Sequence, residues 1–219
     1  NGNAASTSQS NNTVTLNDFA VPTITGTTVN AANTKVVVTF SEAVYDTNGG
    51  AGALEVGDFA VTIAANGGAA GLSSATPSAI SSSGNVYTLT LATTGTATGA
   101  EVYTVAPVSN SIYDANGNAA STSQSNNTVT LNDLTAPTMV ITASEGADGF
   151  TSNDASLSLT FTSSESTTNF AAADITVTGG TLGALSGSGT TYTVTFTPSG
   201  SGATTIDVGA DGFTDAAGN

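Results

Sequence analysis

Alternating apolar and polar residues dominate the chain and predict short β-strands. Val, Ile, Leu, Phe and Tyr occupy every second position of these runs, with Thr and Ser between them. A period of two is typical of strands that bury one face. The runs cover 13–16, 35–40, 59–63, 86–91, 102–108, 128–131, 138–142, 156–162, 174–179, 191–197 and 204–209. Clusters of Gly, Asn, Ser and Asp separate the runs, and no stretch has the apolar period of a long helix, so we expect antiparallel β-sandwiches.

One segment of the chain occurs twice without a difference. Residues 1–18 and residues 116–133 both read NGNAASTSQSNNTVTLND. A domain-sized repeat of this kind indicates units in tandem, and such repeats should be sought before any other feature. The sequence therefore predicts a chain of similar domains.

A second and more distant repeat relates the two halves of the chain. D-F-A-V-P, T-F-S-E, G-D-F-A-V and D-A-N-G-N follow one another in the first half, and D-L-T-A-P, T-F-T-S-S-E, A-D-I-T-V and D-A-A-G-N follow in the second. We therefore predict one domain over 19–133 and another over 134–219. We interpret residues 1–18 as the terminal strand of a preceding or neighbouring unit. The second domain ends at D-A-A-G-N, so we expect it to lack the last strand that 116–133 supplies to the first.

The order of these motifs resembles that of bacterial Ig-like repeats in giant secreted or cell-surface adhesins. The first half is similar to the repeat type of a cyanobacterial motility-associated surface protein, and the second resembles Ig-like units joined by D-x-T-A-P linkers. The resemblance implies two tandem Ig-like antiparallel β-sandwiches. It also implies extracellular spacer modules that meet neighbouring repeats head to tail, many of which bind Ca²⁺ near domain junctions.

The charge balance narrows the possible partners. Sixteen carboxylates accompany a single basic residue, Lys35, and the formal net charge is −15. Nucleic acids are bound chiefly through Lys and Arg, and anionic lipid headgroups attract the same residues, so neither is an expected partner. No apolar run is long enough to insert into a membrane. We expect an extracellular or cell-surface location.

The residue types argue against catalysis. The chain contains neither His nor Cys, and Lys35 is its only amine side chain. Nucleophilic and acid–base catalysis usually recruit these groups. A pair of carboxylates could hydrolyse glycosides, but such sites usually add aromatic platforms for the sugar, and Trp is absent. We predict a protein that is not an enzyme.

Carboxylates near the predicted strand ends form the one candidate site. Ca²⁺ prefers oxygen ligands from Asp, Glu, Asn and backbone carbonyls. Each D-A-x-G-N turn offers an Asp and an Asn, and the linker Asp, the strand-end Glu and a strand-start Asp could converge on it. The alternative is a plain turn, because Asp, Asn and Gly are common turn residues. The candidate ligands are Asp18, Glu42, Asp58, Asp114, Asn118, Asp133, Glu165, Asp174, Asp215 and Asn219.

The expected function is a non-catalytic structural repeat of an extracellular stalk, adhesin or surface filament. Ca²⁺ at the domain junctions would stiffen it. One alternative is a self-assembling fibre whose subunits are joined by donor-strand exchange. A second alternative is a carbohydrate- or ice-binding module, which should carry a flat aromatic face or a regular ladder of Thr.

Overall fold

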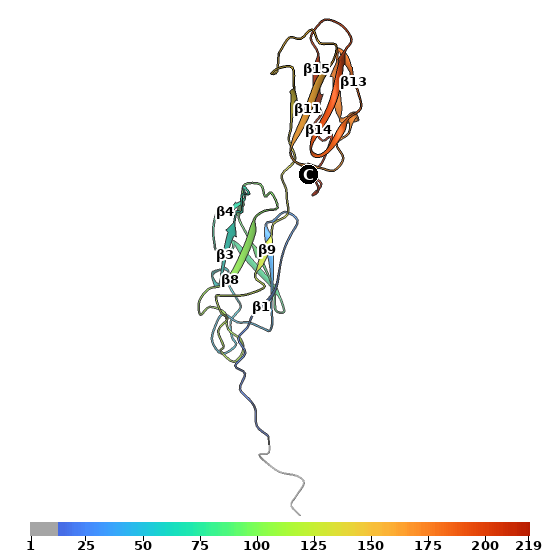
Figure 1. Cartoon of the computed structure of the whole chain (residues 1–219). Helices are drawn as coiled ribbons and strands as arrows, with labels where there is room; N and C mark the ends of the chain where they lie inside the picture. The colour runs from blue at the N-terminus through green and yellow to red at the C-terminus, as the bar shows by residue number, and fades with distance from the viewer. Residues whose placement is uncertain (1–12) are drawn as a thin grey trace, which may run out of the picture. The chain divides into compact units, whose positions relative to one another are not determined.

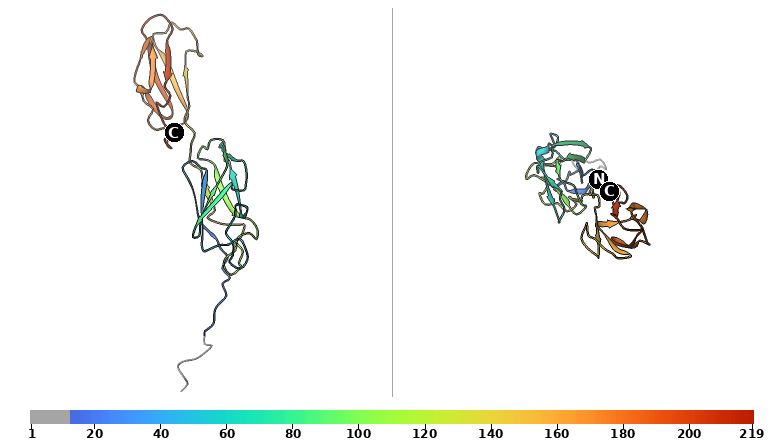
Figure 2. Two further views of the ribbon diagram at one scale, coloured as in Figure 1. Left: turned by 180° about the vertical axis from the view of Figure 1, so that it is seen from behind. Right: turned by 90° about the horizontal axis from the view of Figure 1, so that it is seen from above.

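The computed structural model describes residues 13–219 and divides into two compact units (Figures 1 and 2). The first unit ends at Leu131 and leaves out Thr96–Ala100. The second unit consists of that short loop and Asn132–Asn219. Each unit consists of antiparallel sheets, so the predicted all-β sandwich class is confirmed.

The first unit has a four-stranded sheet and a three-stranded sheet. The larger sheet has the order β1 (Ile24–Val29), β2 (Lys35–Phe40), β6 (Val86–Thr90) and β5 (Ala79–Ser83). The smaller sheet has the order β3 (Phe59–Ala64), β8 (Val102–Pro107) and β9 (Thr128–Thr130). A short pair, β4 (Gly71–Leu72) and β7 (Thr93–Thr94), lies beside them, and the 3₁₀ turn η1 (Val56–Asp58) leads into β3.

The second unit repeats the two main sheets of this arrangement, with one strand fewer in the smaller sheet. Its larger sheet has the order β10 (Met139–Ala143), β11 (Leu157–Thr167), β14 (Ser186–Pro198) and β13 (Gly180–Leu182). Its smaller sheet contains only β12 (Ile175–Thr178) and β15 (Thr205–Val208), preceded by the 3₁₀ turn η2 (Ala172–Asp174). Within residues 13–219, β15 has no neighbour in the position that β9 occupies beside β8.

Alternating side chains from the facing sheets form each core. In β2, Val36, Val38 and Phe40 are fully buried, while the residues between them are only partly so. The ring centroids of Phe40 and Tyr87 lie 5.8 Å apart, with Phe59 close to both. Burying each such side chain contributes about 1.5–3 kcal/mol, which explains why the two-residue period specifies the fold.

Equivalent positions can be assigned from strand register. Val38 faces Tyr87 in the first unit, and Phe161 faces Tyr192 in the second. Residues Phe59 and Ile175 each follow a 3₁₀ turn and open the strand that pairs with β8 or β15. The two units are thus copies of one topology, as the distant repeat in the sequence indicates.

One predicted strand is not formed. The run 13–16 belongs to no strand, and Val14 and Leu16 are 84% and 82% exposed. The alternation of residues fits a strand, but within the described residues no partner strand lies beside it. The other predicted runs all contain strands, whereas β1, β4, β5, β7 and β13 were not predicted. Residues 1–12 of the predicted terminal strand lie outside the described residues.

Helical structure in residues 13–219 is confined to the turns η1 and η2, of three residues each. No helix in this part of the chain could span a membrane.

Candidate metal centre

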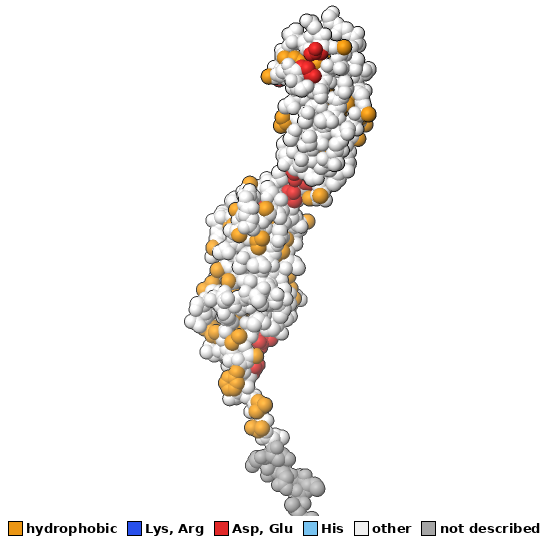
Figure 3. Space-filling model, viewed as in Figure 1, with side chains coloured by type: hydrophobic (Ala, Val, Ile, Leu, Met, Phe, Trp, Pro, Cys, Tyr) orange, Lys and Arg blue, Asp and Glu red, His pale blue; other side chains and the backbone are white. Residues whose placement is uncertain are grey.

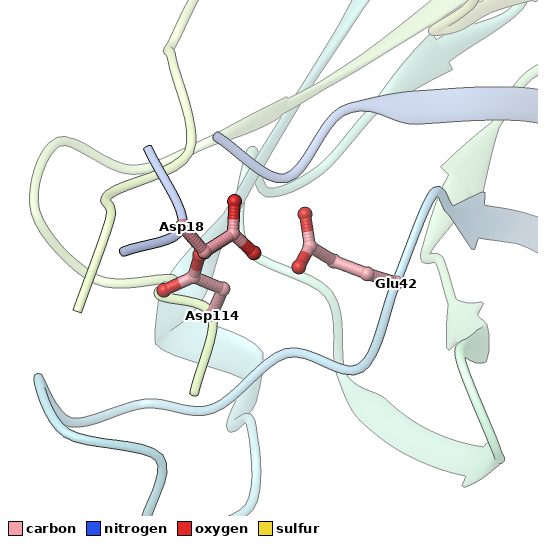
Figure 4. A group of neighbouring side chains, drawn as sticks. All are labelled: Asp18, Glu42 and Asp114. Carbon is pink, nitrogen blue, oxygen red and sulfur yellow. The ribbon is translucent and has the colours of Figure 1, made fainter. Parts of the chain in front are cut away.

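Three carboxylates meet at one end of the first unit (Figure 4). Asp18 precedes β1, Glu42 follows β2, and Asp114 lies in the turn after β8. One carboxylate oxygen from each lies within 4.8 Å of the others. We call this group the first acidic cluster.

Asp114 is held in place by the D-A-N-G-N turn around it. Its Oδ1 accepts hydrogen bonds from the backbone N–H groups of Asn116 (2.9 Å) and Asn118 (2.7 Å). Its Oδ2 accepts one from Asn118 Nδ2 at 2.7 Å. Burial alone would raise the pKa of the fully buried Asp114, but these hydrogen bonds outweigh it and lower the pKa. The turn therefore keeps this carboxylate ionised.

Asn118 also connects the turn to the segment that enters the unit. Its Nδ2 donates a second hydrogen bond, of 3.1 Å, to the backbone carbonyl of Asp18. Asp18 Oδ1 in turn accepts a hydrogen bond from the N–H of Ala20 at 2.9 Å. Because the amide nitrogen of Asn118 makes both contacts, this side chain positions the carboxylates, and its predicted role as a ligand through oxygen stays a prediction.

Burial and neighbouring negative charges both change the pKa of Glu42. Its pKa is raised first by burial and then by repulsion from Asp114 and Asp18. Lys35 is the only basic residue in the whole sequence, so basic side chains cannot neutralise the acidic groups. Figure 3 shows acidic side chains gathered in small groups on a mostly uncharged surface. The first acidic cluster thus concentrates negative charge that a cation would stabilise.

The second unit contains the same arrangement, formed by Asp133, Glu165 and Asp215. Their carboxylate oxygens also lie within 4.8 Å of one another, and we call them the second acidic cluster. Asp215 Oδ1 accepts hydrogen bonds from the N–H groups of Gly218 (2.7 Å) and Asn219 (2.9 Å).

The remaining contacts of the second acidic cluster also match those of the first. Asn219 Nδ2 donates one hydrogen bond to Asp215 Oδ2 (3.0 Å) and another to the backbone carbonyl of Asp133 (3.2 Å). The pKa of Glu165 is raised by burial and then by its two neighbours, and hydrogen bonds lower the pKa of Asp215 despite its burial.

These two clusters suit a hard divalent cation. Each presents carboxylates from three separate parts of the chain, and Ca²⁺ binds six to eight oxygens, with carboxylates in mono- or bidentate contact. Backbone carbonyls and water commonly complete such a shell. Asp18, Glu42 and Asp114 would hold one ion, and Asp133, Glu165 and Asp215 would hold another.

Two further candidate ligands lie outside the acidic clusters. Asp58 Oδ2 accepts a hydrogen bond from the N–H of Glu55 at 2.6 Å, and Asp174 Oδ2 accepts one from the N–H of Ala171 at 2.8 Å. Each therefore caps the 3₁₀ turn before a strand. The structure assigns these two carboxylates a role in the fold, and their role as ligands stays a prediction.

Comparison with known proteins agrees with the fold of the second half. Residues 133–219 match the family model described as a bacterial Ig-like domain. This half of the chain is similar to a bacterial Ig-like repeat. The matched range contains the complete second acidic cluster, from Asp133 through Glu165 to Asp215. Comparisons with curated proteins and with solved structures gave no match.

Proposed function

We propose that the chain is a non-catalytic structural repeat of an extracellular stalk, adhesin or surface filament, with Ca²⁺ bound at both acidic clusters. The observation that carries the proposal is the recurrence of the cluster. Its three carboxylates and its Asn contacts are the same in two units whose sequences have otherwise diverged. A plain turn needs the Asp and Asn of D-A-x-G-N, but it does not need the strand-end Glu or the linker Asp.

The proposed role of the ion follows from which parts of the chain it would join. Asp18 and Asp133 lie where the chain enters a unit, whereas the Glu and the turn Asp belong to the sandwich. One cation contacting all three would neutralise their repulsion and fix the entering segment to the sandwich. Calcium would therefore restrict bending at the point where the chain enters each unit.

Several observations support the surface location and the structural role. The second half is similar to a bacterial Ig-like domain, a fold that commonly occurs in surface proteins. The first half has the same topology and resembles the cyanobacterial motility-associated repeat type. The absence of His and Cys from the sequence supports a role without catalysis.

Calorimetric titration with Ca²⁺ tests the proposal. The chain should bind one ion per cluster, Asp114→Asn should abolish binding at the first acidic cluster only, and Asp215→Asn should abolish it at the second only. Asp148→Asn removes an exposed charge outside both clusters and is the matched control. If the unaltered chain gives no saturable binding, or if the cluster variants behave like the control, the calcium proposal is wrong.

Cellular location needs a separate test. Antibodies raised against the folded chain should label intact cells of the source organism. Labelling only after cell lysis would contradict the surface location.

A further inference from the structure

The turn that contains Asp114 also contains an asparagine directly followed by a glycine, Asn116 and Gly117. In such a pair the backbone nitrogen of the glycine can attack the side-chain carbonyl carbon of the asparagine, because a glycine has no side chain to block a close approach. The corresponding residues of the second unit are Ala217 and Gly218, so the second turn lacks the amide that reacts. The two turns therefore differ in one chemical property.

The side-chain amide of Asn116 is accessible and loosely held. The residue is exposed, so water reaches its side chain. Its Nδ2 donates a hydrogen bond to Asp18 Oδ2 at 3.4 Å, which is long for a hydrogen bond and restrains the amide only weakly. The side chain is therefore free to turn its carbonyl carbon toward the backbone nitrogen of the next residue.

The backbone nitrogen of Gly117 makes a long hydrogen bond as well. Its N–H donates to the backbone carbonyl of Asp114 at 3.3 Å, whereas the N–H groups of Asn116 and Asn118 donate to Asp114 Oδ1 at 2.9 Å and 2.7 Å. The longest of these three hydrogen bonds thus belongs to the nitrogen that attacks. Gly117 has a φ of 89°, and a Cβ at this position would overlap Asn48 Oδ1, so the turn requires a glycine there.

We propose that Asn116 is a site of spontaneous deamidation, which adds a fourth carboxylate beside the first acidic cluster. The backbone nitrogen of Gly117 forms a bond to Cγ of Asn116, and the bond from Cγ to Nδ2 breaks. The amide group leaves as ammonia with the proton that the backbone nitrogen loses. Water then opens the succinimide ring at either carbonyl and gives aspartate or isoaspartate at position 116. Water is the only co-reactant, so the reaction requires neither an enzyme nor an oxidant.

The product changes the charge that Asp18 faces. In the unmodified chain an N–H group of Asn116 donates to Asp18 Oδ2. Deamidation replaces that nitrogen with a carboxylate oxygen, next to a cluster to which Glu42 and Asp114 already contribute negative charge. Lys35 is the only basic residue in the sequence, so basic side chains cannot neutralise the group. Because like charges at short distance repel, deamidation should loosen the entering segment from the sandwich.

The isoaspartate product also changes the backbone. It inserts one methylene group into the main chain between position 116 and Gly117, which displaces the N–H groups that bind the carboxylate of Asp114. The ammonia is lost to solvent, so the change is irreversible. The first unit thus carries a modification that accumulates with time, whereas the turn of the second unit, with Ala217 at the equivalent position, does not.

Two other Asn-Gly pairs lie in the described residues, at 48–49 and 66–67. Both asparagines are exposed, and neither belongs to an acidic cluster. Modification at position 116 must therefore be assigned separately from modification at these two pairs. Cleavage on the N-terminal side of aspartate places the three pairs in separate peptides, which begin at Asp46, Asp58 and Asp114.

Peptide mapping of aged protein tests the reaction. The full chain is incubated at mildly alkaline pH in metal-free buffer, folded in one sample and unfolded by urea in the other. We expect Asn116 in the folded chain to deamidate at a rate within an order of magnitude of its rate in the unfolded chain. If the peptide that begins at Asp114 stays unmodified in the folded chain while it reacts in the unfolded chain, the proposal is overturned.

A pair of variants tests the consequence for the first acidic cluster. Asn116→Asp reproduces the charged product, and Asn116→Ala, which matches Ala217 of the second unit, is the control. At low ionic strength the first unit of Asn116→Asp should melt a few degrees below that of the control. Added salt should reduce this difference several-fold, because salt screens exposed charges. Equal melting temperatures, or a difference that salt does not change, would overturn the proposal. Both tests are made without calcium, so their outcome is independent of the metal proposal.

Discussion

Replacing Glu165 by Gln should change the stability of the second unit in opposite directions with and without calcium. The substitution keeps the size of the side chain and removes its charge. In calcium-free buffer it removes repulsion from Asp133 and Asp215, so the unit should become more stable. With calcium present it removes a charged ligand, so the variant should lose most of the stabilisation that the ion gives.

The magnitudes follow from the spacing of the second acidic cluster. Its carboxylate oxygens lie within 4.8 Å of one another. At that distance two unit charges repel by about 1 kcal/mol in water and about 3.5 kcal/mol at an effective dielectric constant of 20. Glu165 is only partly buried and solvent screens it, so the lower figure applies to each neighbour. The calcium-free gain should therefore be on the order of 1–2 kcal/mol.

Binding of calcium should stabilise the unaltered chain. A ligand at a hundredfold excess over its dissociation constant stabilises the folded state by about 2.7 kcal/mol. For a domain of this size, each kcal/mol shifts the melting temperature by about 4–8 °C. Without calcium, Glu165→Gln should thus raise the melting temperature by several degrees. With calcium, the variant should lose most of the increase in melting temperature that the ion gives the unaltered chain, and this loss should exceed the calcium-free gain.

Differential scanning calorimetry in calcium and in metal-free buffer measures both effects. Asp148→Asn in the same unit serves as the control and should leave the calcium-dependent shift intact. If Glu165→Gln lowers stability without calcium, or keeps the full calcium shift, the electrostatic account of the cluster is wrong.

Three other substitutions or conditions have defined outcomes. Asp114→Ala should destabilise the first unit by about 2–4 kcal/mol even without calcium, because it leaves buried donors of the turn without their acceptor; an unchanged urea midpoint would contradict this. In metal-free buffer, melting temperature should rise as the pH falls from 7 toward 4.5, because burial and neighbouring carboxylates raise the pKa of Glu42 and its charge destabilises the fold above that pKa. Hydrogen bonds lower the pKa of Asp114 although burial acts to raise it, so this carboxylate stabilises the fold only while it is ionised. Below pH 3.8 Asp114 takes up a proton, and the melting temperature should therefore fall again. A melting temperature that changes in one direction only between pH 7 and the acid limit would refute this pair of assignments. Gly180→Ala should destabilise the second unit by about 1–3 kcal/mol, since its Cβ would lie 2.3 Å from the ring of Phe196 and 2.5 Å from the backbone oxygen of Thr197; a thermal melt like that of unaltered protein would contradict this.

The pattern of apolar and polar residues predicted the fold well because burial of one face of each strand is the main constraint on this fold. Strands such as β2 and β8 alternate strictly between buried and less buried residues, and that alternation is visible in the sequence. β5 and β13 consist largely of exposed or small residues and make their contacts at sheet edges, so they lack the pattern. Alternation also predicted a strand over 13–16, but a pattern within one segment does not reveal whether a partner strand lies beside it.

The order of the motifs predicted which carboxylates lie close together, but it did not predict the hydrogen bonds that each of them makes. The strand-end Glu and the D-A-x-G-N Asp both lie at the end of the sandwich where the chain enters, so Glu42 and Asp114 meet although they are far apart in sequence. The role of Asn118 depends on which atom of its amide faces the carboxylates, and the sequence does not specify this. An acidic residue directly before a strand, such as Asp58, can be a metal ligand or a capping residue, and the sequence does not distinguish the two. In the structure Asp58 caps a turn.

Locating calcium in crystals of the full chain tests the central claim most directly. Anomalous scattering from crystals grown at saturating calcium should show one peak within about 2.3–2.6 Å of oxygens from Asp18, Glu42 and Asp114. A second peak should lie in the same relation to Asp133, Glu165 and Asp215. If neither cluster contains a peak, the shared arrangement of carboxylates serves only to shape two turns, and the claim that these repeats hold calcium is contradicted.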